Sequence, residues 1–255
     1  MPTSGPPDPT PSPPPPDTAK PTTPPPILLA LSGPTSSGKT TLAAALHAIF
    51  PPPHSLTIHA DDFYKPDSEI PTTDDGLPDW DCAGSLDLAA LAAVLRGLRS
   101  GAPAPARLLR QGNFAPDGVH GAAAAVTGGI GAATVERLRR AAAAARGDRR
   151  RRTLVVVEGF LLFGRSVPVG VRDLFDVKVL LRAGRGQARA RRAGRGAYVT
   201  LEGFWQDPEG YFDRVVWPNY VEEHGGMVDG VDGDGVVEGE GSFGQRVHCS
   251  DPGGG

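Results

Sequence analysis

The sequence of 255 residues predicts an α/β fold with a mainly parallel sheet and helices on both faces. Three observations predict this class. Short apolar runs typical of buried strands recur along the chain, Ala/Leu-rich segments typical of helices lie between them, and a Gly-rich turn follows the first run. Strands that alternate with helices need right-handed crossovers, and these crossovers place helices on both faces of a parallel sheet.

The first strand, helix and second strand are predicted between residues 27 and 60. Ile27–Ser32 is an apolar run that a Gly-Pro pair ends, as expected of a buried strand. Lys39–Phe50 contains no internal glycine or proline and stops at three prolines, which predicts a helix with a sharp end. Ser55–Ala60 alternates apolar and polar residues and is predicted as the second strand.

The next helix is predicted to begin at Ser85, whose side chain would cap it, and to run to Arg99 with Asp87 in its first turn. Two further strands are predicted at Leu154–Val157, which is rich in β-branched residues, and at Asp176–Leu181.

Composition divides the chain into three parts. Residues 1–26 hold thirteen of the 27 prolines and residues 225–255 hold eleven of the 34 glycines, so neither end can bury enough apolar surface to offset the entropy of ordering. We therefore predict a disordered Pro-rich arm (1–26), one folded domain (27–224) and a disordered Gly/Asp-rich tail (225–255). The domain would carry a low-complexity insertion at about 112–152, in which Thr134–Arg146 favours a helix.

Charge and cysteine content exclude several classes of protein. No apolar run reaches the length of about 18 residues that a membrane span needs. The N-terminus has Lys20 as its only cation, unlike a secretory or transit peptide. Two cysteines are too few for a disulfide framework or a structural zinc site, and a net charge of −3 gives no reason to expect a nucleic-acid partner.

We expect a cytoplasmic protein. The Arg149–Arg152 run leaves a nuclear signal or a nucleic-acid patch open, beside the interpretation as a solvated helix edge.

The strongest signal is Gly33–Thr40, which fits the G-x-x-x-x-G-K-[ST] pattern between a predicted strand and a predicted helix. Such a loop turns its backbone N–H groups toward phosphate, and the helix N-terminus adds partial positive charge. Lys39 would reach the β- and γ-phosphates and Thr40 would ligate Mg²⁺. The motif predicts a P-loop NTPase-type fold that binds ATP and Mg²⁺, against the alternative of a Gly-rich turn with a chance lysine. The residues expected to contact the nucleotide are Gly33, Thr35, Ser36, Ser37, Gly38, Lys39, Thr40 and Thr41.

Carboxyl groups follow the second and third predicted strands. Asp61-Asp62 lies where open α/β sheets bind ligands, and one of the pair can accept the proton of an attacking hydroxyl group. Glu158 ends the third strand, in the position where an acidic residue holds Mg²⁺ directly or through water. The alternative for the aspartates is a helix cap or a solvated turn, and that for Glu158 is a residue kept for solubility.

Two further segments fit a nucleoside kinase, which also suits the size of the domain. Trp80 beside Asp81 can stack on a base while the carboxylate accepts from ribose hydroxyls, although a buried indole beside a capping aspartate is an alternative. Residues 182–195 hold six arginines, no acid and several glycines, which favours a mobile lid over a packed helix. An RNA-binding segment is the alternative, but the interleaved aromatics that stack on bases are missing.

Together these motifs resemble the nicotinamide riboside kinase family, and the spelling of Tyr198–Trp205 resembles its fungal members. The resemblance implies ATP-dependent phosphorylation of the 5′-hydroxyl of nicotinamide riboside to nicotinamide mononucleotide, on a salvage route to NAD. Uridine or cytidine kinase activity, another small-metabolite kinase and a non-catalytic nucleotide-binding protein are the alternatives. The matching segments are Gly33–Leu42, Asp61–Pro66, Asp67–Ile70, Trp80-Asp81, Glu158–Phe163 and Gly210–Tyr220.

The resemblance also implies a role for individual residues. Asp61 would be the catalytic base, and Trp80 and Tyr198 would form the two faces of a sandwich around the base of the nucleoside. The chain departs from the family's pattern in its long insertion and in its tail, which lacks the expected closing strand and helix. The further implied roles are catalysis for Lys39 and Glu158, metal binding for Thr40 and Glu158, and the ribose diol for Asp81. Arg191 and Arg195 of the lid would contact ATP, and Arg195 would also contact the substrate.

Overall fold

The computed structural model describes residues 24–105, 108, 130–146, 152–195, 198–199, 204–225, 227 and 248–249. Nearly all of the predicted Pro-rich arm, the part of the insertion before residue 130 and most of the predicted tail lie outside these residues. None of the described helices has the length and apolar character needed to cross a membrane.

The centre of the fold is a five-stranded sheet in the order β2-β3-β1-β4-β7, and its first four strands are parallel. This confirms the predicted mainly parallel sheet, because each of the four predicted strands is present within two residues of its expected ends. β1 pairs in register with β3 on one side and with β4 on the other. The parallel strands are β1 (Ile27–Ser32), β2 (Ser55–His59), β3 (Leu154–Gly159) and β4 (Val177–Leu180).

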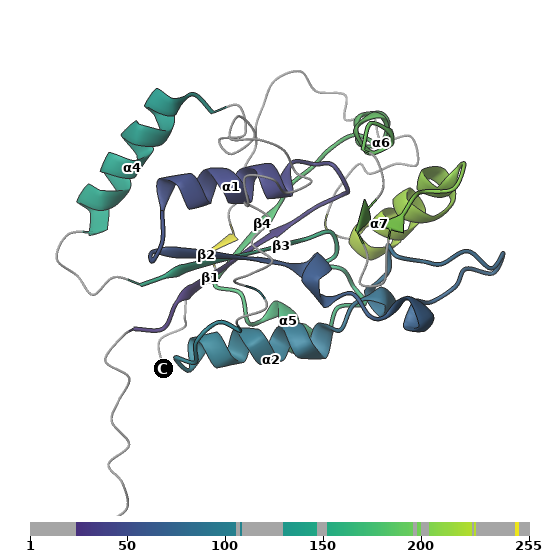
Figure 1. The fold of residues 1–255 in the computed structure, drawn as a ribbon, viewed down its shortest axis with the longest axis horizontal. Helices are drawn as coiled ribbons and strands as arrows, with labels where there is room; N and C mark the ends of the chain where they lie inside the picture. The colour runs from purple at the N-terminus through teal and green to yellow at the C-terminus, as the bar shows by residue number, and fades with distance from the viewer. Residues whose placement is uncertain are drawn as a thin grey trace, which may run out of the picture.

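Both faces of the sheet are covered by helices, as predicted. α1 (Lys39–Ile49) crosses one face, whereas α2 (Leu88–Arg99) and the short α5 (Val169–Arg172) cover the other (Figure 1). Alternate residues of β1 serve the two sides, because side chains of a strand point to opposite faces in turn. Leu28 packs in the core beneath α2, and Leu29 packs with the apolar side chains of α1.

The start of α2 differs from the prediction. The side chain of Asp87 caps the helix by accepting from the backbone N–H of Ala90 at 2.8 Å, so Ser85 is not the capping residue. Ser85 ends a short 3-10 helix (Ala83–Ser85) and is completely buried. The chain cannot turn helical earlier, because Leu86 is still bridged to the backbone of Tyr64.

The predicted helix in the insertion is confirmed as α4 (Ala132–Arg146), which packs on α1 at the side of the molecule (Figure 1). Arg139 of α4 donates two hydrogen bonds to the carbonyl oxygen of Ala48 near the end of α1, at 2.6 and 3.2 Å. These bonds satisfy a carbonyl group that has no partner within the last turn of a helix. Of the Arg149–Arg152 run, only Arg152 is described, and it is exposed.

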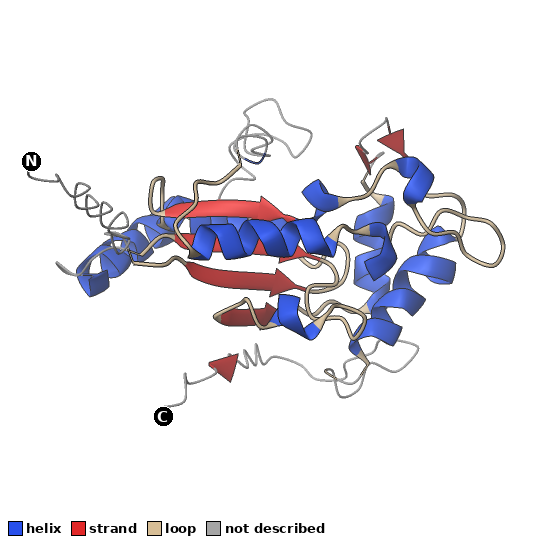
Figure 2. Ribbon diagram, turned by 90° about the horizontal axis from the view of Figure 1, so that it is seen from below, coloured by secondary structure: helices blue, strands red, loops and turns tan. Residues whose placement is uncertain are grey.

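Two helices lie together beyond the C-terminal ends of the parallel strands, α6 (Arg185–Ala193) and α7 (Trp217–His224) (Figures 1 and 2). α7 continues a π-helical segment, Phe212–Val216. A small hairpin, β5 (Tyr198–Val199) and β6 (Phe204–Trp205), completes this part.

The arginine-rich segment, for which the sequence favours a mobile lid over a packed helix, forms the helix α6. Gly184 and Gly194 flank α6 as its caps, where glycine is well tolerated, and only Gly186 lies inside the helix. Ala188 is completely buried against the aromatic side chains of the α7 segment, so burial of this face stabilises the helix.

The tail contributes one unexpected strand, β7 (His248–Cys249), which pairs antiparallel with Val177 and Lys178 of β4. From its composition the whole of this tail is predicted to be disordered, and these two residues depart from that expectation. β4 would otherwise be an edge strand with unpaired backbone donors and acceptors, which any extended segment nearby can satisfy.

Candidate active site

The phosphate loop between β1 and α1 depends on two glycines. Gly33 has φ +148°, and a Cβ atom there would lie 2.5 Å from the carbonyl oxygen of Leu181, so a larger residue cannot be accommodated. Gly38 has φ +96° at the cap of α1, in a region that side chains disfavour. Ser36 also has a positive φ, of 58°. The loop is therefore held in a curved conformation that the sequence motif requires.

The polar groups of the loop fit a phosphate ligand. Lys39 is buried, and its ammonium group donates to the carbonyl oxygens of Gly33 at 3.1 Å and Pro34 at 2.9 Å. The hydroxyl oxygens of Ser36 and Ser37 are buried and have no hydrogen-bond partner within the described part of the chain. Unpaired buried donors around a lysine are costly unless an anion satisfies them.

Thr40, Glu158 and His59 form one buried network at the ends of α1, β3 and β2. The hydroxyl of Thr40 donates to Oε1 of Glu158 at 2.9 Å, and Nδ1 of His59 lies 2.7 Å from the same oxygen. Burial alone would raise the pKa of Glu158, but the hydrogen bond from His59 and the charge of Lys39 outweigh it and lower the pKa. These contacts therefore favour the ionised form of Glu158.

The oxygen atoms of Thr40 and Glu158 suit Mg²⁺, which prefers hard oxygen ligands and keeps several waters or phosphate oxygens. The described residues hold no cluster of three or more His, Cys, Asp or Glu side chains able to bind a metal by themselves. The remaining ligands of such an ion would be waters or phosphate oxygens, as is usual at phosphoryl-transfer sites.

Asp61 lies in a 3-10 turn (Ala60–Phe63) directly after β2. Although Asp61 is exposed to water, desolvation by the surrounding protein atoms and then the charge of Glu158 raise the pKa of Asp61 to about 6. Lys39 and His59 oppose this shift. The charges of Asp61 and Glu158 also act on Lys39, whose pKa burial lowers. The structure thus brings together the two acids and the lysine that the sequence analysis singles out.

Trp80 is buried, with 7% of its surface exposed, and lies among other aromatic rings. Tyr64 meets it edge-on at 5.4 Å between ring centroids, and Trp205 of β6 lies 5.9 Å away at an angle of 47°. Trp205 is not among the predicted site residues, although two aromatic residues in a row on a short strand could have indicated it. For Tyr198, the predicted second face, only the backbone pairing with Trp205 is described.

Asp81 is paired with an arginine of α6 whose individual role the sequence analysis misses. Arg192 donates from Nη1 and Nη2 to the two carboxylate oxygens of Asp81, each at 3.0 Å. It also donates from Nε and Nη2 to Asp207, at 2.6 and 3.0 Å. Burial raises the pKa of Asp81, although Arg192 opposes this effect. No local spacing marks Arg192 among the six arginines, because its partners lie far away in the sequence.

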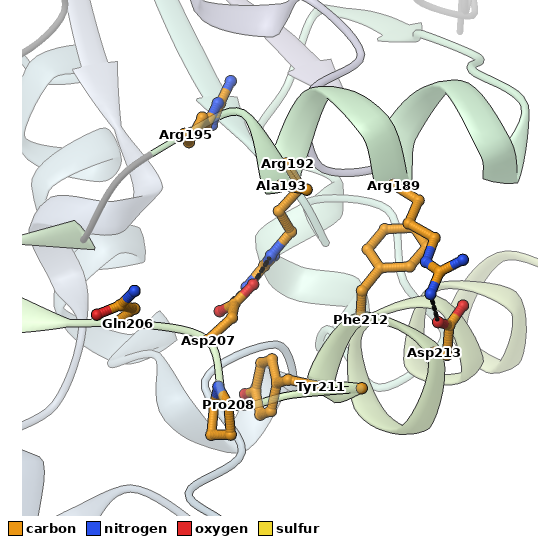
Figure 3. Close-up of a pocket in the computed structure, with 11 residues that line it drawn as sticks. Arg189, Arg192, Ala193, Arg195, Gln206, Asp207, Pro208, Tyr211, Phe212 and Asp213 are labelled. Atoms are coloured by element: carbon orange, nitrogen blue, oxygen red, sulfur yellow. Dashed lines mark hydrogen bonds and ion pairs between the residues drawn. The ribbon is translucent and has the colours of Figure 1, made fainter.

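A pocket of about 250 Å³ lies between α6 and the segment that leads into α7 (Figure 3). In Figure 3, Arg192 and Asp207 point toward each other across it, and Arg189 reaches Asp213 at its far end. The lining residues are Arg189, Arg192, Ala193, Arg195, Gln206, Asp207, Pro208, Gly210, Tyr211, Phe212 and Asp213.

The two lid arginines that were predicted to contact the nucleotide both lie near the phosphate loop. Arg191 donates from Nη1 to the carbonyl oxygen of Ser36 at 3.2 Å. Arg195 is exposed at the end of α6, and its charge contributes to the lowered pKa of Lys39. α6 therefore extends from the phosphate loop at one side to Asp81 at the other.

A parallel sheet with a phosphate loop, a strand-end acid beside the loop threonine and an arginine-rich helix over both define a P-loop phosphotransferase of the small-molecule kinase class. The chain matches no protein-family profile. It is 36% identical over 198 residues to nicotinamide riboside kinase of Schizosaccharomyces pombe, covering 77% of this chain and 78% of that protein.

The chain belongs to the nicotinamide riboside kinase family. Two other fungal members support this assignment: that of Eremothecium gossypii is 34% identical, with 77% of this chain and 75% of the relative covered, and that of Saccharomyces cerevisiae is 30% identical, with 82% of each covered. A putative fructose transport system kinase from Silicibacter sp. TM1040 aligns with a TM-score of 0.37 at 20% identity over 69% of this chain and 74% of its own, a likeness too low for inference.

Proposed function

We propose that this chain transfers the γ-phosphoryl group of ATP to the 5′-hydroxyl of nicotinamide riboside, giving nicotinamide mononucleotide and ADP. The observation that carries the proposal is the meeting of Lys39, Thr40, Glu158 and Asp61 at one end of the sheet, in a member of this family. A phosphate site and a carboxyl group with a raised pKa beside it are what transfer to a hydroxyl group requires.

On the phosphate side, the chain would bind and orient the triphosphate. The hydroxyl groups of Ser36 and Ser37 and the backbone of the loop would donate to phosphate oxygens, and Lys39 would move from its loop carbonyls to the β- and γ-phosphates. Thr40 and Glu158 would hold Mg²⁺, which neutralises charge on the phosphates when it is bound. Arg191 and Arg195 of α6 would add positive charge around the transferring group.

On the acceptor side, Asp61 would orient the 5′-hydroxyl group and take its proton as the oxygen bonds to the γ-phosphorus. The bond from that phosphorus to the bridging oxygen of ADP then breaks. A pKa of about 6 is well placed for this role, because the group is mostly ionised at neutral pH and is still basic enough to accept a proton.

The acceptor itself would lie beside Trp80 and Asp81. Asp81 and Asp207 together pair with the single positive charge of Arg192, so this group of three side chains carries more negative than positive charge beside the aromatic rings. This supports a cationic pyridinium base over a neutral one, because both the charge and the ring faces attract a cation.

A kinase assay on the purified chain with nicotinamide riboside and uridine in competition tests the proposal. We expect preferential phosphorylation of nicotinamide riboside, and a loss of about two to four orders of magnitude in kcat for Asp61→Asn. Asp62→Asn, which removes the neighbouring carboxyl group of the same turn, should lose far less.

Two outcomes would contradict the proposal. Preference for uridine would identify a kinase of another nucleoside on the same scaffold. No transfer from ATP to any nucleoside in a single turnover would identify a nucleotide-binding protein without catalysis.

A further inference from the structure

The acceptor loop, Pro78–Asp81, carries Trp80 and Asp81 and is held by Tyr211, a residue that has no role in the mechanism proposed above. The hydroxyl group of Tyr211 accepts from the backbone N–H of Trp80 at 3.1 Å and donates to the carbonyl oxygen of Pro78 at 3.0 Å. Tyr211 is completely buried, and burial raises the pKa of its phenol, so the hydroxyl group keeps the proton that it donates. One side chain therefore satisfies two backbone groups on either side of Asp79.

The ring of Tyr211 contacts two more elements of the site. It meets Trp205 edge-on at 5.4 Å between centroids, and the guanidinium carbon of Arg192 lies 5.8 Å from its centroid. Trp205 in turn contacts Trp80, and Arg192 pairs with Asp81. Tyr211 thus connects three elements. Its hydroxyl group binds the loop Pro78–Asp81, and its ring contacts α6 and the hairpin.

The helical segment that contains Tyr211 also forms hydrogen bonds with the loop through a second side chain. Asn219 donates to both carboxylate oxygens of Asp79 at 3.0 Å and, more weakly, to the carbonyl oxygen of Asp81 at 3.3 Å. Tyr211 and Asn219 are separated by the π-helical segment Phe212–Val216, and π-helical turns occur frequently at functional sites. The loop is consequently held by two side chains of one continuous helical segment.

We infer that Tyr211 is a positioning residue for the nucleoside acceptor: its hydroxyl group sets the backbone of Trp80, and its ring sets Arg192 against Asp81. This inference rests on the proposed function for the identity of the acceptor. It deepens that function by assigning a task to the Gly210–Tyr220 segment, because the contacts of Tyr211 reach the acceptor side of the site and not the phosphate loop.

Tyr211→Phe tests the inference, because it removes the hydroxyl group and keeps the ring. We expect the KM for nicotinamide riboside to rise about three- to tenfold, the effect of losing a buried hydrogen bond, while the KM for ATP changes less than twofold. Tyr220→Phe is the matched control: Tyr220 is buried in α7, and its ring contacts Trp217 and His224. This control should leave both KM values unchanged.

A second measurement does not depend on the substrate. The Trp80 amide donates to Tyr211 in the wild type, so its hydrogen exchange should be at least tenfold faster in Tyr211→Phe and unchanged in Tyr220→Phe. An active wild type whose KM for the acceptor is the same in Tyr211→Phe refutes the positioning role alone. A wild type that phosphorylates a different nucleoside refutes the proposed substrate, and the KM comparison with that nucleoside then decides the role. A wild type that phosphorylates nothing refutes the proposed function, and unchanged Trp80 exchange refutes the anchoring of the loop in any case.

Discussion

Replacing Arg192 with methionine is expected to cost about 3–5 kcal/mol of unfolding free energy, the range for breaking a buried ion pair. Arg192 and Asp81 expose only 7% and 9% of their side chains, and Asp207 exposes 23%. Four charge-assisted hydrogen bonds join the three groups. The summed energy of these four hydrogen bonds would exceed this range, but much of that energy only offsets the cost of taking the charges out of water. The penalty arises because methionine leaves two carboxylates without their cation.

Urea unfolding at pH 7 measures the effect, with Arg189→Met as the matched control. Arg189 lies one turn earlier in α6 and pairs with Asp213, but 62% of its side chain is exposed, so its loss should cost less than about 1 kcal/mol. The triple variant with Asp81→Asn and Asp207→Asn should recover part of the loss, because no uncompensated charge then remains. Equal losses of unfolding free energy for the two arginine variants would refute the view that the buried group of Arg192, Asp81 and Asp207 contributes this stability.

Two further predictions concern Asp61 and Asp87. If Asp61 must be ionised to accept a proton, kcat/KM should rise with pH through a midpoint of about 6, since its pKa is raised to that value, and Asp61→Asn should remove this limb from its residual activity. A midpoint near 4, the ordinary pKa of an aspartate, would contradict the assignment. Asp87→Ala should destabilise the protein by about 1 kcal/mol in urea unfolding by removing the cap of α2. Asp87→Asn should keep most of the capping, and equal losses in the two variants would count against a capping role.

The layered fold could be predicted because its signals are local. The run Ile27–Ser32 is apolar on both faces and is bounded by glycine, and Lys39–Phe50 is bounded by prolines, so propensity, pattern and breakers agree. The same reasoning fails at the start of α2, where Ser85 and Asp87 are both good caps by residue type. Tertiary contacts decide between them, because Ser85 donates instead to the carbonyl oxygens of Trp80 and Cys82.

The proximity of the residues on the phosphate side could also be predicted, whereas the pairing of Asp81 with Arg192 on the acceptor side could not. Lys39 and Thr40 belong to one continuous motif, and Glu158 follows from its place at the end of a strand. Arg192 and Asp81 are 111 residues apart, and their pairing depends on how α6 lies over the acceptor loop. Six arginines with similar neighbours offer no local feature that distinguishes the buried one from the exposed ones.

The pairing of Asp81 with Arg192 is compatible with a role in binding ribose, although the carboxylate already has a partner. Each oxygen of Asp81 accepts one hydrogen bond from Arg192, and a carboxylate oxygen can accept a second along its other lone pair. A ribose diol could therefore donate to Asp81 without breaking the ion pair. Because Arg192 fixes the plane of the carboxylate, less rotational freedom is lost when the diol binds, and Asp207 supports this by fixing Arg192 in turn. If the proposed function holds, Asp81, Arg192 and Asp207 would act together as a pre-organised acceptor of hydrogen bonds and would not block the site.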